Sequence, residues 1–151
     1  MFFRNLTLFR FPTNLDLSEL DARLAEFPLK PVGPLEMSSR GFISPISRDA
    51  EAMTHRIEDA IWLTVGGEEK ILPGPVVNEL LARRIEEFED KQGRKPGGKM
   101  RKQMKDDLLQ ELMPRAFVKP LRSDALIDTQ HGVVVVNTSS RKSAENVVSE
   151  I

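Results

Sequence analysis

The sequence predicts an α+β fold: antiparallel sheet hairpins with packed helices and a protruding helical hairpin. Several short segments rich in β-branched and aromatic residues lie between turn residues, a pattern typical of strands. Elsewhere, apolar residues recur every three or four positions over two segments, which indicates amphipathic helices joined by a Gly/Pro-rich turn. With 151 residues, 40% of them hydrophobic, the chain is long enough to bury the core of one domain.

The predicted strands are residues 2–11, 60–65, 68–72, 116–129 (broken near Pro120) and 133–137. Gly66-Gly67 is interpreted as a tight turn that makes residues 60–65 and 68–72 a hairpin. Pro12 ends the first strand because proline cannot donate to a strand ladder. Residues 28–45 are expected to be a loop around one short extended piece at 41–43. The aromatic residues expected in the core of the sheet are Trp62, Phe2, Phe3, Phe9 and Phe11.

The predicted helices start near Ser18, Pro75, Lys99 and Lys142. Ser18 is a candidate N-cap for the first helix, and Ser139 or Ser140 for the last. Proline suits the first turn of a helix, so Pro75 opens the second one. The second and third helices form the hairpin, over about residues 75–113, with Gly and Pro in its turn.

Composition excludes several classes of function. The chain has no cysteine, so a disulfide framework, a thiolate metal site and a cysteine nucleophile are impossible, and a reducing cytosol fits. Arg4 and Arg10 interrupt the apolar N-terminus, unlike a signal peptide, and no apolar run reaches membrane-spanning length. We therefore expect a soluble, cytoplasmic protein. The apolar spacing of the last helix continues to Ile151, which indicates a shortened chain.

Charge is strongly separated along the chain, although the formal net charge is only −1. Residues 51–90 hold ten Asp/Glu against four Lys/Arg, and residues 91–122 hold ten Lys/Arg against three Asp/Glu. Residues 91–105 contain no carboxylate and seven cations: Lys91, Arg94, Lys95, Lys99, Arg101, Lys102 and Lys105. Such a block favours binding of a polyanion. A solvated helix tip that merely keeps the protein soluble is the alternative.

The residues expected to contact DNA phosphates are Arg94, Lys95, Lys99, Arg101, Lys102 and Lys105, with Arg115 and Lys119 in support. In an extended strand, Arg115 and Lys119 would share one face with Phe117 between them. Phe117 could stack on a base or pack in a core or interface, and we favour packing. The chain contains no helix-turn-helix, zinc-finger or RRM pattern, so binding should be independent of base sequence.

A metal-dependent nuclease is a second hypothesis. Glu68 and Lys70, with Asp59 ahead of them, resemble a core in which two carboxylates hold Mg²⁺ and a lysine activates water. The alternative interpretation of residues 68–70 is an exposed hairpin strand that carries alternating charges. His55 and His131 have no ligand spacing, and the serines and glycines form no nucleophile elbow or phosphate loop. No cofactor, metal site or small-molecule active site is therefore expected.

Several segments resemble the RdgC family, the recombination-associated proteins of proteobacteria. The resemblance covers essentially the whole chain. It rests on the opening Phe-x-Asn-Leu strand, residues 68–77, residues 112–117, and residues 127–129 with the Gly132 turn and the Lys142-x-Ala144-Glu145 helix. The strings Glu-Glu-Lys-Ile-Leu-Pro and Pro-Arg-Ala-Phe are the most specific.

The resemblance implies a nucleoid-associated protein that binds DNA without sequence preference and restrains RecA filaments. Family members are α+β proteins that close as two-fold dimeric rings around a basic hole, and the Pro-Arg-Ala-Phe segment makes Phe117 an interface candidate. They are longer than this chain, which is expected to be an N-terminal portion, so that dimerisation of the chain itself stays open. A direct contact with RecA through the acidic face of helix residues 79–90 is a third hypothesis.

Overall fold

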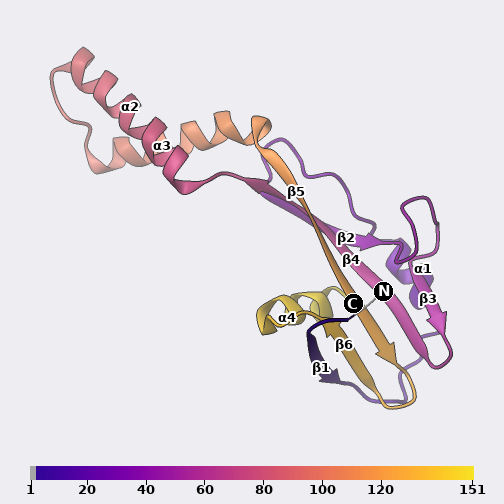
Figure 1. The fold of residues 1–151 in the computed structure, drawn as a ribbon. Coiled ribbons are helices and arrows are strands. Elements are labelled where there is room, and N and C mark those ends of the chain that lie inside the picture. The colour runs from indigo at the N-terminus through magenta and orange to yellow at the C-terminus, as the bar shows by residue number, and fades with distance from the viewer. Residues whose placement is uncertain (1–2) are drawn as a thin grey trace. The chain divides into compact units, whose positions relative to one another are not determined.

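The computed structural model describes residues 3–151, which divide into two compact units. Of the described residues, the sheet unit comprises residues 3–31, Ser39–Glu68 and Pro120–Ile151. The hairpin unit comprises Val32–Ser38 and Glu69–Lys119. Figure 1 traces the helices and strands along the chain. Part of the predicted strand at residues 2–11 lies outside the described residues, as does the expected core position of Phe2.

Six strands form one sheet within residues 3–151 (Figure 1). They are β1 (Leu6–Arg10), β2 (Ser38–Ile43), β3 (Thr54–Ile57), β4 (Ala60–Ile71), β5 (Phe117–Asp128) and β6 (Val133–Asn137). Their order is β1-β6-β5-β4-β2, and β3 pairs with β4. The pairs β1–β6, β5–β6 and β3–β4 are antiparallel. The predicted α+β class with an antiparallel sheet is confirmed.

The helices are α1 (Leu20–Ala25), α2 (Gly74–Gln92), α3 (Gly98–Leu112) and α4 (Arg141–Glu150), with a short 3₁₀ helix, η1 (Met113–Arg115), after α3. The predicted cap at Ser140 is confirmed, because its side chain accepts a hydrogen bond from the Ser143 N–H. The predicted cap at Ser18 is wrong. The helix starts two residues later and Glu19 precedes it without a side-chain cap. No helix among residues 3–151 is long and apolar enough to cross a bilayer.

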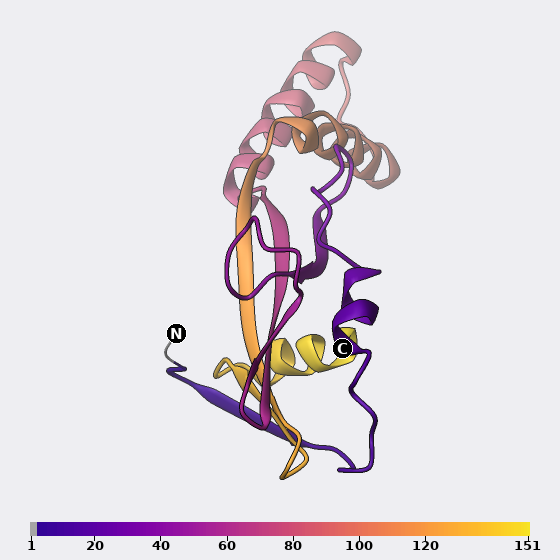
Figure 2. The same ribbon diagram turned by 90° about the vertical axis from the view of Figure 1, so that its right-hand side faces the viewer.

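The core of the sheet unit lies on one face of the sheet, under α1 and α4 (Figure 2). Buried side chains alternate along the strands, as a sheet with one packed face requires. The core residues are Leu20, Leu24, Phe42, Ile61, Leu63, Val65, Ala125, Ile127, Val134, Val136, Ala144 and Val147, with Phe9 and Phe11 packed against them. Fully burying one such Leu, Val or Ile side chain contributes about 1.5–3 kcal/mol to stability.

A polar network lies on the opposite face of the sheet and includes Trp62. The Trp62 indole N–H and the buried Thr64 hydroxyl both donate to the Asp124 carboxylate, at 3.2 Å and 2.6 Å. Arg122 donates to the same carboxylate at 3.1 Å and to the Pro45 carbonyl at 3.0 Å. The prediction that Trp62 is a core residue is therefore wrong. It is half-buried and alternates with the core residues of β4.

The predicted hairpin at Gly66-Gly67 is also wrong, because β4 runs without a turn from Ala60 to Ile71. Both glycines are buried within the strand. A Cβ atom added at Gly67 would lie 3.2 Å from the Ser39 carbonyl oxygen, and one at Gly66 would lie 3.0 Å from the Ile43 side chain. The glycine pair thus permits close packing on a central strand rather than a change of direction.

Pro120 does not interrupt β5, contrary to the prediction. β6 pairs with β5 only over Ala125–Asp128. The segment around Pro120 therefore resembles an edge on that side, where a missing N–H is tolerated. β2 is longer than predicted, because it covers Ser38–Ile43 rather than residues 41–43. β3 was not predicted.

Candidate nucleic-acid interface

Proline and glycine residues set the two ends of α2, the first helix of the helical hairpin. Pro73 precedes α2 and Pro75 lies in its first turn, as predicted. At the other end Gly93 adopts φ = 67°, and its N–H donates to the Glu89 carbonyl at 2.8 Å. Only glycine adopts this left-handed conformation without steric cost, so the residue stops the helix and turns the chain. Pro96 is buried in the connection to α3.

Apolar contacts and one ion pair hold α2 against α3. Leu108 is buried and Met104 is half-buried on α3, at the i, i+4 spacing that places both on one helix face. The Arg84 guanidinium binds the Glu111 carboxylate across the two helices, with an Nη1–Oε1 distance of 3.3 Å. This hydrogen bond lowers the pKa of Glu111 and raises the pKa of Arg84.

The basic cluster consists of Lys91, Arg94, Lys95, Lys99, Arg101, Lys102 and Lys105, at the end of α2, in the connection and on α3. All seven are exposed. No salt bridge joins any of them to an acidic residue among residues 3–151, whereas Arg83 and Arg84 on α2 are both paired. The cluster therefore presents positive charge that no neighbouring carboxylate neutralises.

Two features organise these cations. Lys99, Lys102 and Lys105 are three residues apart on one helix, so they occupy neighbouring positions along one side of α3. Like charges at this spacing repel, and a bound polyanion relieves that repulsion. The Arg94 guanidinium lies 6.0 Å from the centre of the Phe88 ring, a cation–π distance that anchors this arginine to α2.

Arg115 and Lys119 do not lie together on one face of a strand, contrary to the prediction. Arg115 belongs to η1, so only Phe117 and Lys119 lie on β5 at strand spacing. Arg115 and Lys119 are exposed. Phe117 is 83% exposed, so packing in the core of the described chain is excluded, and the base-stacking and interface hypotheses stay open.

The residues of the nuclease hypothesis are not brought together. Asp59 precedes β4 and Glu68 lies near its far end. Nine residues of extended chain span about 30 Å, far beyond what two ligands of one Mg²⁺ allow. Lys70 is buried, and its Nζ donates to the carbonyl oxygens of Gly33 at 2.7 Å and Pro34 at 2.5 Å. Among residues 3–151, no three His, Asp or Glu side chains gather in a way that could hold a metal ion.

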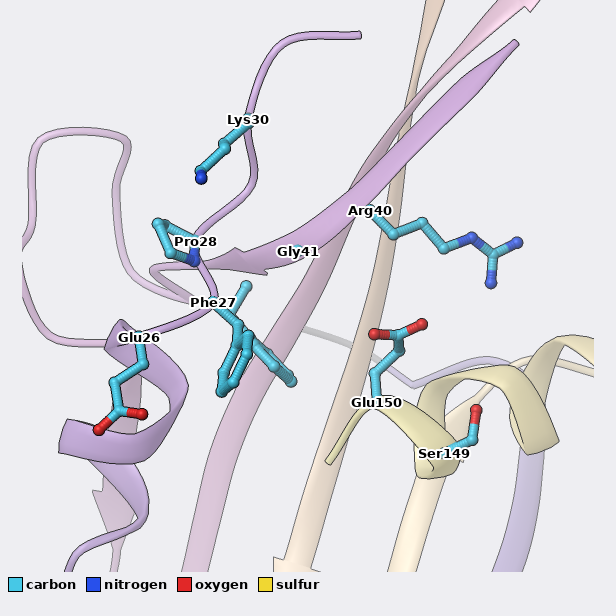
Figure 3. A pocket seen from close by; sticks show the side chains of 9 residues that line it. Glu26, Phe27, Pro28, Lys30, Arg40, Gly41, Ser149 and Glu150 are labelled. Atoms are coloured by element: carbon cyan, nitrogen blue, oxygen red, sulfur yellow. The ribbon is translucent and has the colours of Figure 1, made fainter. Parts of the chain in front are cut away.

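A pocket in the sheet unit carries mixed charge (Figure 3). Lys30 and Arg40 line it together with Glu26 and Glu150. Two cations and two carboxylates leave no net charge to attract a polyanion. The charges that line this pocket therefore give no support to a polyanion site there.

The sequence model of the family described as "Putative exonuclease, RdgC" matches residues 1–151. This chain belongs to the RdgC family. Curated relatives named recombination-associated protein RdgC are 68% identical in Xanthomonas campestris pv. campestris (strain B100), 67% in Xanthomonas oryzae pv. oryzae (strain MAFF 311018) and 64% in Stenotrophomonas maltophilia (strain R551-3). Each comparison extends over 152 residues, 100% of this chain and 50% of the relative.

The chain thus spans about half the length of the curated RdgC proteins that it matches. The word recombination in the name describes those full-length relatives. One residue pair of the RdgC hairpin unit was not predicted from the sequence: Arg84 binds Glu111, which lies 27 positions away. Their opposite charges were the only available signal, and several other acids could have matched it.

Proposed function

We propose that this RdgC chain is a DNA-binding, nucleoid-associated module that acts without sequence preference and modulates RecA-dependent recombination. The observation that supports it most is the basic cluster: seven exposed cations without salt bridges to the described acids. The family name adds the context of recombination.

Such a cluster is suited to bind the phosphate groups of DNA. Lys and Arg on a helix surface displace condensed counterions from DNA, and this release supplies most of the free energy of non-specific binding. Lysine is a compact charge on a flexible stem, and four of the seven cations lie on α3, so they can adapt to a phosphate backbone of any sequence. Arg115 and Lys119 add two exposed cations from the same unit.

The first experiment measures the affinity of duplex DNA at low salt for the triple variant Lys99→Ala, Arg101→Ala, Lys102→Ala. We expect weaker binding by about the same factor on duplexes of three unrelated sequences, because phosphates are common to all of them. The control Lys30→Ala, Arg48→Ala, Lys142→Ala removes the same charge from exposed positions of the sheet unit. Equal loss in both variants, or loss on one sequence only, contradicts the proposal.

A second candidate function is Mg²⁺-dependent cleavage of DNA, favoured by the word exonuclease in the family description. Labelled DNA is incubated with Mg²⁺ and either the wild type, Asp59→Asn or Glu68→Gln. Cleavage that both substitutions abolish would support the Asp59, Glu68 and Lys70 hypothesis. Cleavage that survives both would place any nuclease activity at other residues.

Two partners are proposed besides DNA. A second copy of the chain could bind through Phe117, a large apolar side chain left 83% exposed. RecA could bind the acidic side of α2, where Glu79, Glu86 and Glu87 are exposed. Retention of RecA by the immobilised chain in DNase-treated extract would support the second contact. Loss of RecA after DNase treatment would show that DNA bridges the two proteins.

A further inference from the structure

The outer edge of β1 is open. β1 and β2 end the strand order of the sheet, but the two ends differ. Beside β2, the Phe42 N–H donates to the Phe27 carbonyl and the Leu29 N–H donates to the Phe42 carbonyl, both at 2.9 Å. Among residues 3–151, no segment pairs with β1 on the side away from β6.

The backbone N–H and C=O groups of three β1 residues face that open side. The Phe11 N–H donates to the Gly132 carbonyl at 2.8 Å, on the β6 side. Backbone groups of successive strand residues alternate in direction, so Thr7 and Phe9 also face β6. The N–H and C=O groups of Leu6, Leu8 and Arg10 therefore face outward, ready to pair with another strand.

The side chains beside this edge are apolar. Leu6 is 54% exposed and Leu8 is 60% exposed. Leu8 is level with Val135 on β6, and Val135 is level with Leu126 on β5. Both neighbours are only half-buried, so an apolar row crosses three strands. Proteins protect lasting sheet edges with lysine, proline or bulges, and Leu6–Arg10 contains only Arg10 at its end.

Charge restricts what can pair here. Arg4 and Arg10 are exposed on either side of the open strand. An antiparallel second copy centred on Thr7 would place Arg4 opposite Arg10, and like charges directly opposite are destabilising. A strand with alternating apolar residues and carboxylates near its ends fits both the leucines and the arginines. The curated relatives contain about as many residues again as this chain.

We propose that the open edge of β1 is a strand-addition site, filled in full-length RdgC proteins by a strand from the part of the polypeptide that this chain does not span. The added strand pairs with the outward groups of Leu6, Leu8 and Arg10 and covers the apolar row. Its carboxylates lie near Arg4 and Arg10.

Amide hydrogen exchange tests this assignment. The 151-residue chain is compared with a joined protein in which the remaining half of the Xanthomonas campestris relative follows residue 151. In the chain alone, the Leu6, Leu8 and Arg10 amides should exchange fast, and those of Thr7 and Phe9 slowly. In the joined protein the three outward amides should slow by at least about tenfold, because each becomes hydrogen-bonded.

The substitution Leu8→Lys in the joined protein should return the Leu6 and Arg10 amides to fast exchange. Leu15→Lys is the matched control, since Leu15 is 54% exposed and lies outside every strand. Should the joined protein not fold, the first strand of the full-length Xanthomonas campestris protein is measured instead. Outward amides that stay fast in the longer protein overturn the proposal. Slow exchange of the three outward amides in the 151-residue chain alone, together with dimers seen by sedimentation, would assign the edge to a second copy. That result would also overturn the proposal.

Discussion

Arg84 on α2 and Glu111 on α3 form the ion pair that joins the two helices of the hairpin unit. Both charges are partly or largely exposed, so solvent screens their attraction and the stabilisation is small. The pair connects α2 to the helix that carries Lys99, Lys102 and Lys105. It thus relates the packing of the hairpin unit to the placement of the basic cluster.

We predict that Glu111→Gln lowers the melting temperature by no more than about 4 °C at pH 7. The pKa of Glu111 is lowered in the folded state by the Arg84 hydrogen bond, so its contribution is present above the ordinary pKa of 4.5 and is lost as pH falls. Thermal unfolding at pH 7 and pH 3 checks this. The difference between wild type and variant should be smaller at pH 3 than at pH 7, and Glu79→Gln, which breaks a pair within α2, is the control. A difference that grows at pH 3 would contradict the account.

Lys70 is predicted to hold the segment Val32–Ser38 in place. Its buried Nζ donates to the Gly33 and Pro34 carbonyls. Lys70→Met keeps much of the volume but leaves two acceptors unpaired, which should cost about 1–3 kcal/mol. Urea unfolding measures the loss, and limited proteolysis should show faster cleavage within residues 32–38. The exposed neighbour Glu69 provides the control Glu69→Gln. Unchanged cleavage in Lys70→Met would show that these two bonds do not order the segment.

Asp124 is predicted to be the most sensitive polar residue of the sheet unit. Asp124→Ala leaves the buried Thr64 hydroxyl and the Trp62 indole N–H without their acceptor. The expected loss is about 2–4 kcal/mol. The chain has a single tryptophan, so fluorescence reports on this site directly. The spectrum of the folded variant should shift as the indole loses its hydrogen bond. Arg122→Ala, which leaves both donors paired, should cost less, and the reverse order would argue against this network.

Phe117 is predicted to act between copies of the chain rather than within one. Because it is 83% exposed, Phe117→Ser should leave the melting temperature almost unchanged. Sedimentation velocity over a range of concentrations should show weaker self-association, by at least about tenfold if the ring is a hot spot. Val118→Ser changes the next residue of β5, whose side chain points to the other face. Equal association of wild type and Phe117→Ser would remove this residue from the interface.

The elements that short-range signals define were predictable from the sequence. Pro75 and Gly93 act within one helical turn of their own positions, so the bounds of α2 followed from steric rules alone. The charge of residues 91–105 is likewise visible without a fold. The β-hairpin predicted at Gly66-Gly67 was wrong because a glycine pair is compatible with two structures, a tight turn or a closely packed strand. Only the neighbours of those residues, Ser39 and Ile43, decide between them.

Pairings between distant segments were not predictable. Asp124 accepts from Trp62, which lies 62 positions earlier, and the carbonyl partners of Lys70 are more than 30 positions before it. Lys70 illustrates the consequence. Its residue type and strand position favoured a catalytic role, but its burial against two carbonyls is a tertiary effect that no local pattern encodes. The candidate DNA-binding residues are exposed, which is the usual state of clustered lysines, and their contact with DNA stays a prediction.

The salt dependence of DNA binding tests the central claim most directly. If six cations of the basic cluster contact phosphates, log Kobs against log[salt] should have a slope of about −5. The variant Lys99→Ala, Arg101→Ala, Lys102→Ala should flatten that slope by up to about 2.7. The control Lys30→Ala, Arg48→Ala, Lys142→Ala should leave it unchanged. The same slope for the wild type and the cluster variant would contradict the assignment of the basic cluster to DNA.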